Sequence, residues 1–238
     1  MVHTVVGQVT PPPPERAVSW KQLIPNIVQD QKRVWLFPLR VTHNHYWIPT
    51  AAVVGATATL IALDAHDTPF FRRTSTFAGF NKALSSGNTS IAMVLAPTAL
   101  YVAGFLRKDR KAQHTALLAG EAVADAEILA TVLKGATRRL RPSGIPPGGP
   151  FNDTWFEQSG SVLRARSSFP SGHSIAAFSI ATVIARRYPT RRWVPFAAYG
   201  AASLIGFSRL TRSAHFPSDV FVGGALGYSI GRFAVLQP

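Results

Sequence analysis

The amino-acid sequence predicts an all-α fold, and three observations support this prediction. Apolar blocks are separated by basic loops, no segment alternates apolar and polar residues as a strand does, and one block carries glycine at every fourth position. Those glycines, Gly223, Gly227 and Gly231, lie on one face of a helix and let a second helix approach closely. Because any tight bundle uses such spacing, it predicts helix crossing rather than a membrane.

Six apolar blocks define the main predicted helices. They cover residues 48–63, 89–106, 112–133, 174–185, 193–207 and 219–236. A membrane-spanning helix needs about 20 apolar residues, and several blocks are shorter unless neighbouring turns extend them. The third also carries Glu121, Asp125 and Glu127, which either pair inside the bundle or tune a basic site nearby. The blocks alone therefore fit a soluble bundle as well as a membrane one.

Two further segments precede these blocks. Residues 1–19 contain four consecutive prolines and predict a flexible tail. Residues 20–47 interleave aromatic and basic side chains, which is typical of an amphipathic segment at a membrane surface. An ordinary amphipathic helix that covers the core is the alternative. We expect one helical domain over residues 48–238.

The charge of the chain favours anionic partners. Lysine and arginine number 25 against 11 acids, for a net charge of +14, which suits nucleic acid, anionic lipid or a phosphorylated substrate. The absence of cysteine excludes disulfides, thiolate catalysis and cysteine-ligated metals. If six segments span a membrane with the N-terminus inside, the compact basic clusters 107–111 and 186–192 lie in inner loops, as the positive-inside rule favours.

Two polar segments carry candidate phosphate-binding residues. In KGATRRLRP, Lys134 and Arg141 are seven positions apart, so a continuous helix places both on one face before Pro142 stops it. In FPSGHS, Ser171 is a candidate N-cap, and the free backbone N–H groups around Gly172 would then form an anion site.

A third segment, SRLTRSAHFPSD, carries Arg209, His215 and Asp219. Pro217 fits an early helix position, so Asp219 falls in the first turn and its carboxylate can reach back to the imidazole of His215. That contact would fix the tautomer and leave the other ring nitrogen free to attack phosphorus. His173 of the second segment can then protonate the leaving oxygen and later activate water.

Together these segments supply what a phosphoryl group requires. Lys134, Arg141 and Arg209 can neutralise the equatorial oxygens that carry the charge of the transition state. A separate acidic group, Asp64, His66 and Asp67, could bind a metal, but a polar exit from the first apolar block is the commoner reason for such a group.

The three motifs, KxxxxxxRP, PSGH and SRxxxxxHxxxD, resemble those of the type 2 phosphatidic acid phosphatase superfamily, which includes the vanadium haloperoxidases. The resemblance covers roughly residues 89–236, and these positions match: Lys134, Arg141, Pro142, Pro170 to His173, Ser208, Arg209, His215 and Asp219. It implies an all-helical fold and metal-free phosphoryl transfer. For the membrane branch it implies six transmembrane helices and an active site that faces away from the cytoplasm.

We therefore expect an integral membrane phosphatase, placed in a bacterial inner membrane, that hydrolyses a lipid phosphomonoester or diphosphate through a phosphohistidine. His215, His173 and Asp219 are the expected catalytic residues; Lys134, Arg141, Ser171, Gly172 and Arg209 are the expected phosphate ligands. No metal, cofactor or nucleic acid is expected to take part, and membrane lipids surround the protein. The alternatives are a soluble acid phosphatase, a vanadium haloperoxidase, a lipid phosphate transferase and a non-enzymatic lipid carrier.

Overall fold

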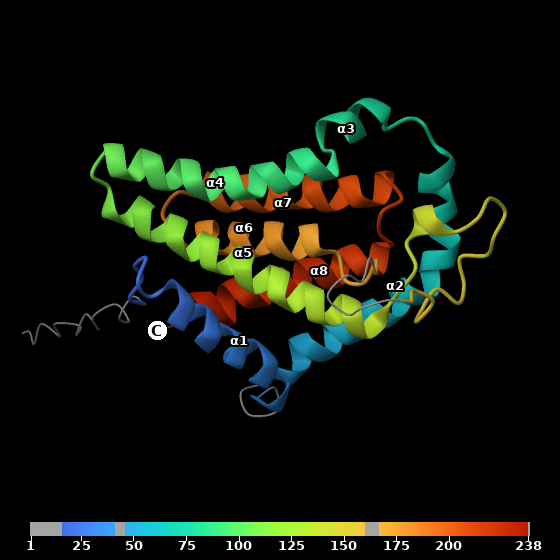
Figure 1. Ribbon diagram of the computed structural model, residues 1–238, viewed down its shortest axis with the longest axis horizontal. Coiled ribbons are helices and arrows are strands. Elements are labelled where there is room, and N and C mark those ends of the chain that lie inside the picture. Colours follow the sequence, from blue (N-terminus) through green and yellow to red (C-terminus); the bar gives the residue numbers. More distant parts are fainter. Residues whose placement is uncertain (1–15, 41–45, 160–166, 238) are drawn as a thin grey trace, which may run out of the picture.

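The computed structural model describes residues 16–40, 46–159 and 167–237, and within these ranges the chain is helical without strands (Figure 1). This confirms the predicted all-α fold for the described residues. The α-helices are α1 (Leu23–Arg40), α2 (Trp47–Arg73), α3 (Ala78–Ala83), α4 (Ser86–Leu106), α5 (Arg110–Thr137), α6 (Gly172–Arg187), α7 (Trp193–Thr211) and α8 (Pro217–Ser229). A 3₁₀ turn, η1 (Pro142–Gly144), follows α5, and a π-helical turn, η3 (Ile230–Val235), continues α8.

Helix α6 lies at the centre of the bundle. It packs against α5, α7, α8 and η3, while α4 packs on α5 and α2 packs on α8 (Figure 1). Small and β-branched residues such as Ala176, Ile175 and Val183 fill α6 and are fully buried. This arrangement brings the C-terminal ends of α5 and α7 and the N-terminal ends of α6 and α8 to one end of the molecule.

The row of glycines on α8 and η3 allows the close contact with α6. A Cβ atom at Gly223 would lie 2.7 Å from the carbonyl oxygen of Ser171, and one at Gly231 would lie 2.7 Å from Cβ of Thr182. At Gly227 an added Cβ would meet the carbonyl oxygen of Ile175 and the backbone nitrogen of Ser179. The predicted helix crossing along this row is therefore confirmed.

We expect Gly227→Ala to destabilise the protein by about 1–3 kcal/mol, because the new methyl group overlaps backbone atoms of α6 that cannot move aside. The matched control is Gly200→Ala in α7, where an added Cβ meets no atom within 4 Å. Thermal unfolding of both variants in detergent measures the difference. Equal melting temperatures would show that α8 and α6 are not held together at this point.

Two of the described helices, α2 and α4, are long and apolar enough to cross a membrane. Only 6% of the most apolar window of α2 is buried, so its apolar side chains face outward rather than into a core. Helices α6 and α8 have 16 and 13 residues, and α5 carries three acids. The prediction of six transmembrane helices therefore stays a prediction.

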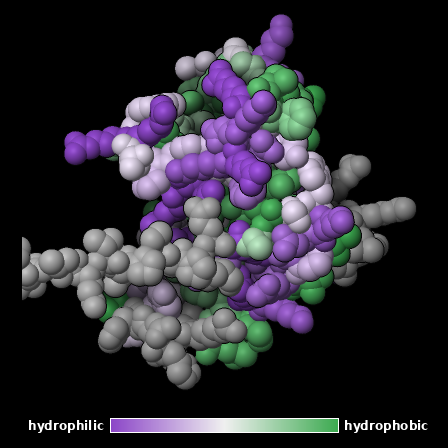
Figure 2. All heavy atoms as spheres, turned by 90° about the vertical axis from the view of Figure 1, so that its left-hand side faces the viewer, coloured by the Kyte–Doolittle hydropathy of each residue, from purple (hydrophilic) through white to green (hydrophobic). Residues whose placement is uncertain are grey.

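Basic side chains gather at the end of the bundle opposite the motif segments. Figure 2 shows this end face on, with hydrophilic side chains over the α4–α5 and α6–α7 turns. The exposed cations of these turns are Arg107, Lys108, Arg110, Lys111, Arg186, Arg191 and Arg192. The two basic clusters that the sequence assigns to inner loops thus lie at the same end of the molecule.

Two of the three acids of α5, Glu121 and Asp125, are partners of the N-terminal segment. Glu121 accepts a hydrogen bond of 2.8 Å from the Asn26 amide, and Asp125 accepts one of 2.8 Å from Gln31. Arg16 lies 2.7 Å from Asp30. Of the two interpretations that the sequence leaves open, structural pairing is the one that these contacts support. The third acid of α5, Glu127, is exposed.

The structure covers only part of the predicted N-terminal segments. The described chain begins at Arg16, inside the predicted tail 1–19; residues 1–15 lie outside the described residues, as do residues 41–45 of the segment 20–47. A location of α1 at a membrane surface stays a prediction.

Candidate active site

His215 lies in the short connection between α7 and α8 and is buried. Its Nδ1 atom is 2.6 Å from the carbonyl oxygen of Ser168, whereas the Oδ2 atom of Asp219 is 3.6 Å away. The predicted contact of Asp219 with the imidazole is therefore present as an ion pair, but the shorter contact of Nδ1 is with the Ser168 carbonyl. A carbonyl oxygen can only accept, so Nδ1 carries the proton and Nε2 keeps its lone pair.

Asp219 lies in the first turn of α8, as predicted from Pro217. Its Oδ2 atom accepts a hydrogen bond of 2.8 Å from the backbone N–H of Phe216, and its Oδ1 atom lies 2.7 Å from Nη1 of Arg139. These two shorter contacts explain why the carboxylate stays 3.6 Å from Nδ1 of His215 rather than at hydrogen-bond distance.

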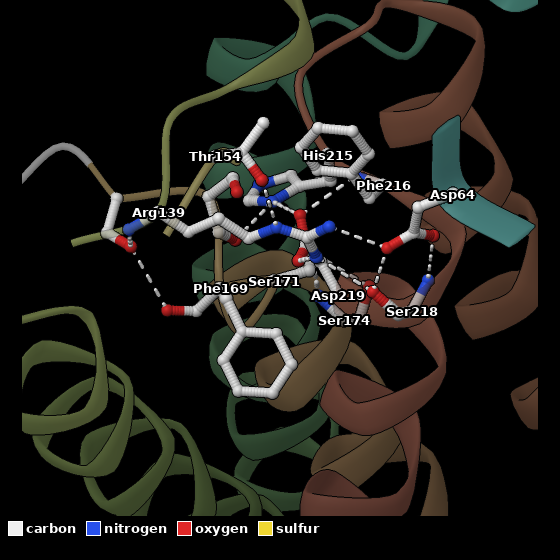
Figure 3. Close-up of polar contacts among 12 residues, drawn as sticks. Asp64, Arg139, Thr154, Phe169, Ser171, Ser174, His215, Phe216, Ser218 and Asp219 are labelled. Carbon is white, nitrogen blue, oxygen red and sulfur yellow. Dashed lines mark hydrogen bonds and ion pairs between the residues drawn. The ribbon is translucent and has the colours of Figure 1, made fainter. Parts of the chain in front are cut away.

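Arg139 was not among the predicted site residues, and it connects Asp219 to helix α2. Its guanidinium lies between two carboxylates, with Nη2 at 2.7 Å from Asp64 and Nη1 at 2.7 Å from Asp219 (Figure 3). Asp64 also accepts hydrogen bonds from the backbone and the hydroxyl of Ser218. The acidic group of residues 64–67 is thus divided: Asp64 is buried at this site, whereas His66 and Asp67 contact each other on the exposed side of α2.

Lys134 and Arg141 do not share a helical face, which corrects the sequence interpretation. Helix α5 ends at Thr137, where Arg138 takes a left-handed conformation, and Arg141 has an extended backbone. The helix ends before Pro142 because the intervening backbone pairs elsewhere: the N–H of Leu140 donates to the carbonyl of Thr154. Lys134 and Arg141 nevertheless remain close enough to interact electrostatically with each other and with His215.

The PSGH segment begins α6 as the sequence predicts. Ser171 is the N-cap, and its hydroxyl accepts from the backbone N–H of Ser174. The N–H of Ser171 itself donates to the carbonyl of Asp219 at 3.0 Å, so it cannot bind an anion. Among the described residues, the N–H groups of Gly172 and His173 have no hydrogen-bond partner.

Gly172 also makes room for Lys134. A Cβ atom added at Gly172 would lie 3.0 Å from the Nζ atom of Lys134. The ammonium group therefore lies directly over the start of α6, where the unpaired N–H groups add further positive charge. Together they form a concentrated site for an anion.

His173 and Arg209 both contact the start of α4, and no sequence motif indicates these contacts. The Nε2 atom of His173 lies 3.2 Å from the carbonyl oxygen of Ser86 and 3.2 Å from the hydroxyl of Ser90. Arg209 is buried and donates to the Ser86 hydroxyl at 2.8 Å and to the Leu84 carbonyl. The region before and at the start of α4 thus forms one wall of the site.

The surroundings of His215, its burial above all, favour the neutral form of the imidazole. Burial is the main cause that lowers the pKa of His215 below its ordinary value, and Asp219 partly opposes it. The nearby cations Arg141 and Lys134 lower that pKa further. A neutral imidazole with a free Nε2 is the form that can attack an electrophile.

Comparisons with known proteins agree with these motifs. The model of the PAP2 superfamily matches residues 115–238. The lipid A 1-phosphatase of Rhizobium etli is 39% identical over 109 residues, which are 46% of this chain and 43% of the relative. The lipid A 1-phosphatase of Porphyromonas gingivalis is 41% identical over 69 residues, which are 29% of this chain and 16% of the relative. The chain thus spans less than half the length of either relative.

A solved structure is also similar. The crystal structure of the first transmembrane PAP2 type phosphatidylglycerolphosphate phosphatase from Bacillus subtilis is 22% identical. The match covers 87% of this chain and 92% of that one, with a TM-score of 0.46.

Proposed function

Because the chain belongs to the PAP2 superfamily, whose model matches its residues 115–238, we propose that it is an integral membrane phosphatase that hydrolyses a lipid phosphate. One observation carries this proposal: a buried imidazole donates its Nδ1 proton to a carbonyl and keeps Nε2 free, beside several cations. Those groups fit attack on the phosphorus atom of an anionic ester.

In the proposed first step, Nε2 of His215 attacks phosphorus and the bond to the lipid oxygen breaks. Lys134, Arg141 and Arg209 stabilise the negative charge on the equatorial oxygens, together with the N–H groups that begin α6. His173 gives a proton to the leaving lipid oxygen. The product of this step is a phosphohistidine and a lipid alcohol, or a lipid monophosphate when the substrate is a diphosphate.

In the second step, water attacks the phosphohistidine and inorganic phosphate leaves. His173, now deprotonated, takes a proton from that water, and His215 returns to its neutral state. The Nδ1 proton stays on the imidazole and remains hydrogen-bonded to the Ser168 carbonyl throughout, so Nε2 is the attacking nitrogen in each cycle.

We place the protein in a membrane with six spanning helices, α2 and α4 to α8, and with the active site on the non-cytoplasmic side. Two observations support this placement: α2 and α4 are apolar enough to span a membrane, and the basic α4–α5 and α6–α7 turns lie at the end opposite the starts of α6 and α8 (Figure 1). The expected location remains a bacterial inner membrane.

Phosphate release from a panel of lipid phosphates in detergent tests the proposed activity. Lipid A 1-phosphate is the first substrate to try, because the relatives above are lipid A 1-phosphatases. Phosphatidate, phosphatidylglycerol phosphate and an isoprenoid diphosphate complete the panel. Transfer of the phosphate to an added alcohol, without release to water, would indicate a transferase, and no reaction with any lipid would contradict the proposal.

We expect the rate to be unchanged when a chelator is added, because side-chain cations supply the charge that Mg²⁺ gives in other phosphoryl transfers. Vanadate should inhibit competitively, since it resembles the five-coordinate transition state. Phosphate release with and without the chelator, and inhibition at several substrate concentrations, are the measurements. Strict dependence on Mg²⁺ would contradict this mechanism.

A further inference from the structure

A buried row of three charged side chains lies beside the nucleophile, and two of its members, Asp64 and Arg139, have no role in the mechanism above. Asp64, Arg139 and Asp219, here called the buried ion row, join α2, the segment after α5 and α8. Each of them is at most 2% exposed. Burial of three charges is costly unless all are paired and hydrogen-bonded, so their arrangement is specific.

The side chain of Arg139 is held in place by aromatic rings, carboxylates and hydroxyl groups. Its guanidinium carbon lies over two aromatic rings, 3.9 Å from the centre of Phe216 and 4.4 Å from that of Trp155. Besides the two carboxylates, it donates to the hydroxyls of Thr154 at 3.2 Å and Ser218 at 2.8 Å. A planar guanidinium can serve these partners together, whereas an ammonium group cannot.

Arg139 also fixes both oxygen atoms that face Nδ1 of His215. Its side chain holds the carboxylate of Asp219, which remains 3.6 Å from Nδ1. Its carbonyl oxygen accepts a hydrogen bond of 2.8 Å from the N–H of Ser168, whose own carbonyl lies 2.6 Å from Nδ1. The side chain and the backbone of one residue thus act on the same imidazole.

We propose that Arg139 and Asp64 are positioning residues of the reaction: Arg139 places Asp219 and Ser168 around His215, and Asp64 anchors Arg139 from α2. This inference rests on the proposed function, because it assumes that His215 attacks the substrate. Neither residue touches the reacting atoms. Their effect on the rate therefore passes through Asp219 and the orientation of the imidazole.

A double-mutant cycle tests the side-chain part of this proposal. In the wild-type background, Arg139→Lys should lower kcat/KM by about 10- to 100-fold, because the lysine cannot hold both carboxylates. In an Asp219→Asn background the same change should cost less than about threefold, since the group on which Arg139 acts has lost its charge. Equal losses in the two backgrounds would overturn the proposal.

Asp64→Asn keeps the cycle decisive if Arg139→Lys does not fold. Asparagine is close in size to aspartate. The loss of kcat/KM that Asp64→Asn causes should likewise be smaller in the Asp219→Asn background than in wild type. The matched control is Asp67→Asn, three positions along α2 on the exposed side. Arg138→Lys is the corresponding control for Arg139, because Arg138 is not part of the buried ion row. Both controls should retain wild-type activity.

The pH profile separates positioning from a purely structural role. The charged or titratable groups that face His215 are Asp219 from α8, Lys134 from α5, Arg141 after α5, and His173 from α6. Asp64→Asn removes a negative charge behind Asp219, so the positive charge of Arg139 near the imidazole is compensated less. The imidazole is then protonated less readily, so the acidic limb of kcat/KM should move to lower pH by about 0.3 to 1 unit.

A structural role alone would lower the amount of folded protein without moving this limb. An acidic limb of Asp64→Asn that coincides with that of wild type and of Asp67→Asn would therefore overturn the inference. Failure of the proposed function has a different signature. A His215→Ala variant that kept its activity would show that His215 is not the nucleophile, whatever the Arg139 and Asp64 variants do.

Discussion

His215→Ala is expected to lower kcat by about a thousand-fold or more, because the variant lacks the atom that attacks phosphorus. The cations and the N–H groups at the start of α6 remain, so substrate should still bind and KM should change little. Turnover measured with a lipid phosphate under saturating conditions gives the loss. Near-normal turnover would end the proposed mechanism.

Asp219→Asn is the matched comparison for this first prediction. Its effect should be milder, about 10- to 100-fold, because the Ser168 carbonyl still accepts the Nδ1 proton and keeps the tautomer. The loss comes from the missing negative charge beside the imidazole and from a weakened contact with Arg139. If Asp219→Asn lost as much activity as His215→Ala, the carboxylate would have to fix the tautomer after all.

His173→Ala is expected to show the second large effect, and its size should depend on the leaving group. Protonation by His173 matters most when the departing oxygen is a poor leaving group, such as a lipid alkoxide. For nitrophenyl phosphate the first step should lose much less, since nitrophenolate leaves without a proton. First-step rates for the two substrate types measure this difference, and equal losses for both would contradict a role as general acid.

The second step should remain slow in His173→Ala with every substrate, because water then lacks its base. The phosphohistidine should therefore accumulate. Ser90→Ala is a useful control, since it removes a hydroxyl 3.2 Å from His173 without removing the imidazole. It should change the second step much less than His173→Ala does.

Much of the site follows from local rules that a sequence displays. Ser171 caps α6 and Pro217 begins α8, as their residue types predict. The glycine row predicts the close approach of α8 to α6, which the structure confirms. Each of these predictions depends on backbone preferences or on spacing within a few turns of one helix.

The partners that orient the catalytic side chains could not be predicted in this way. Asp64 and Arg139 are 75 positions apart, and Arg209 meets Ser86 from 123 positions away. The carbonyl of Ser168 carries no signal in the sequence, because every residue has one. The same limitation explains the error at Arg141: tertiary backbone pairing at Leu140 ends α5 early, against the local helical pattern.

The central claim is that His215 becomes phosphorylated and that His173 serves as acid and base. Stopped-flow absorbance with nitrophenyl phosphate on the two alanine variants tests it most directly. His173→Ala should release a burst of about one nitrophenolate per active site, followed by slow turnover. His215→Ala should release none, because it has no group to phosphorylate. A burst from His215→Ala without one from His173→Ala would contradict the account and exchange the two roles.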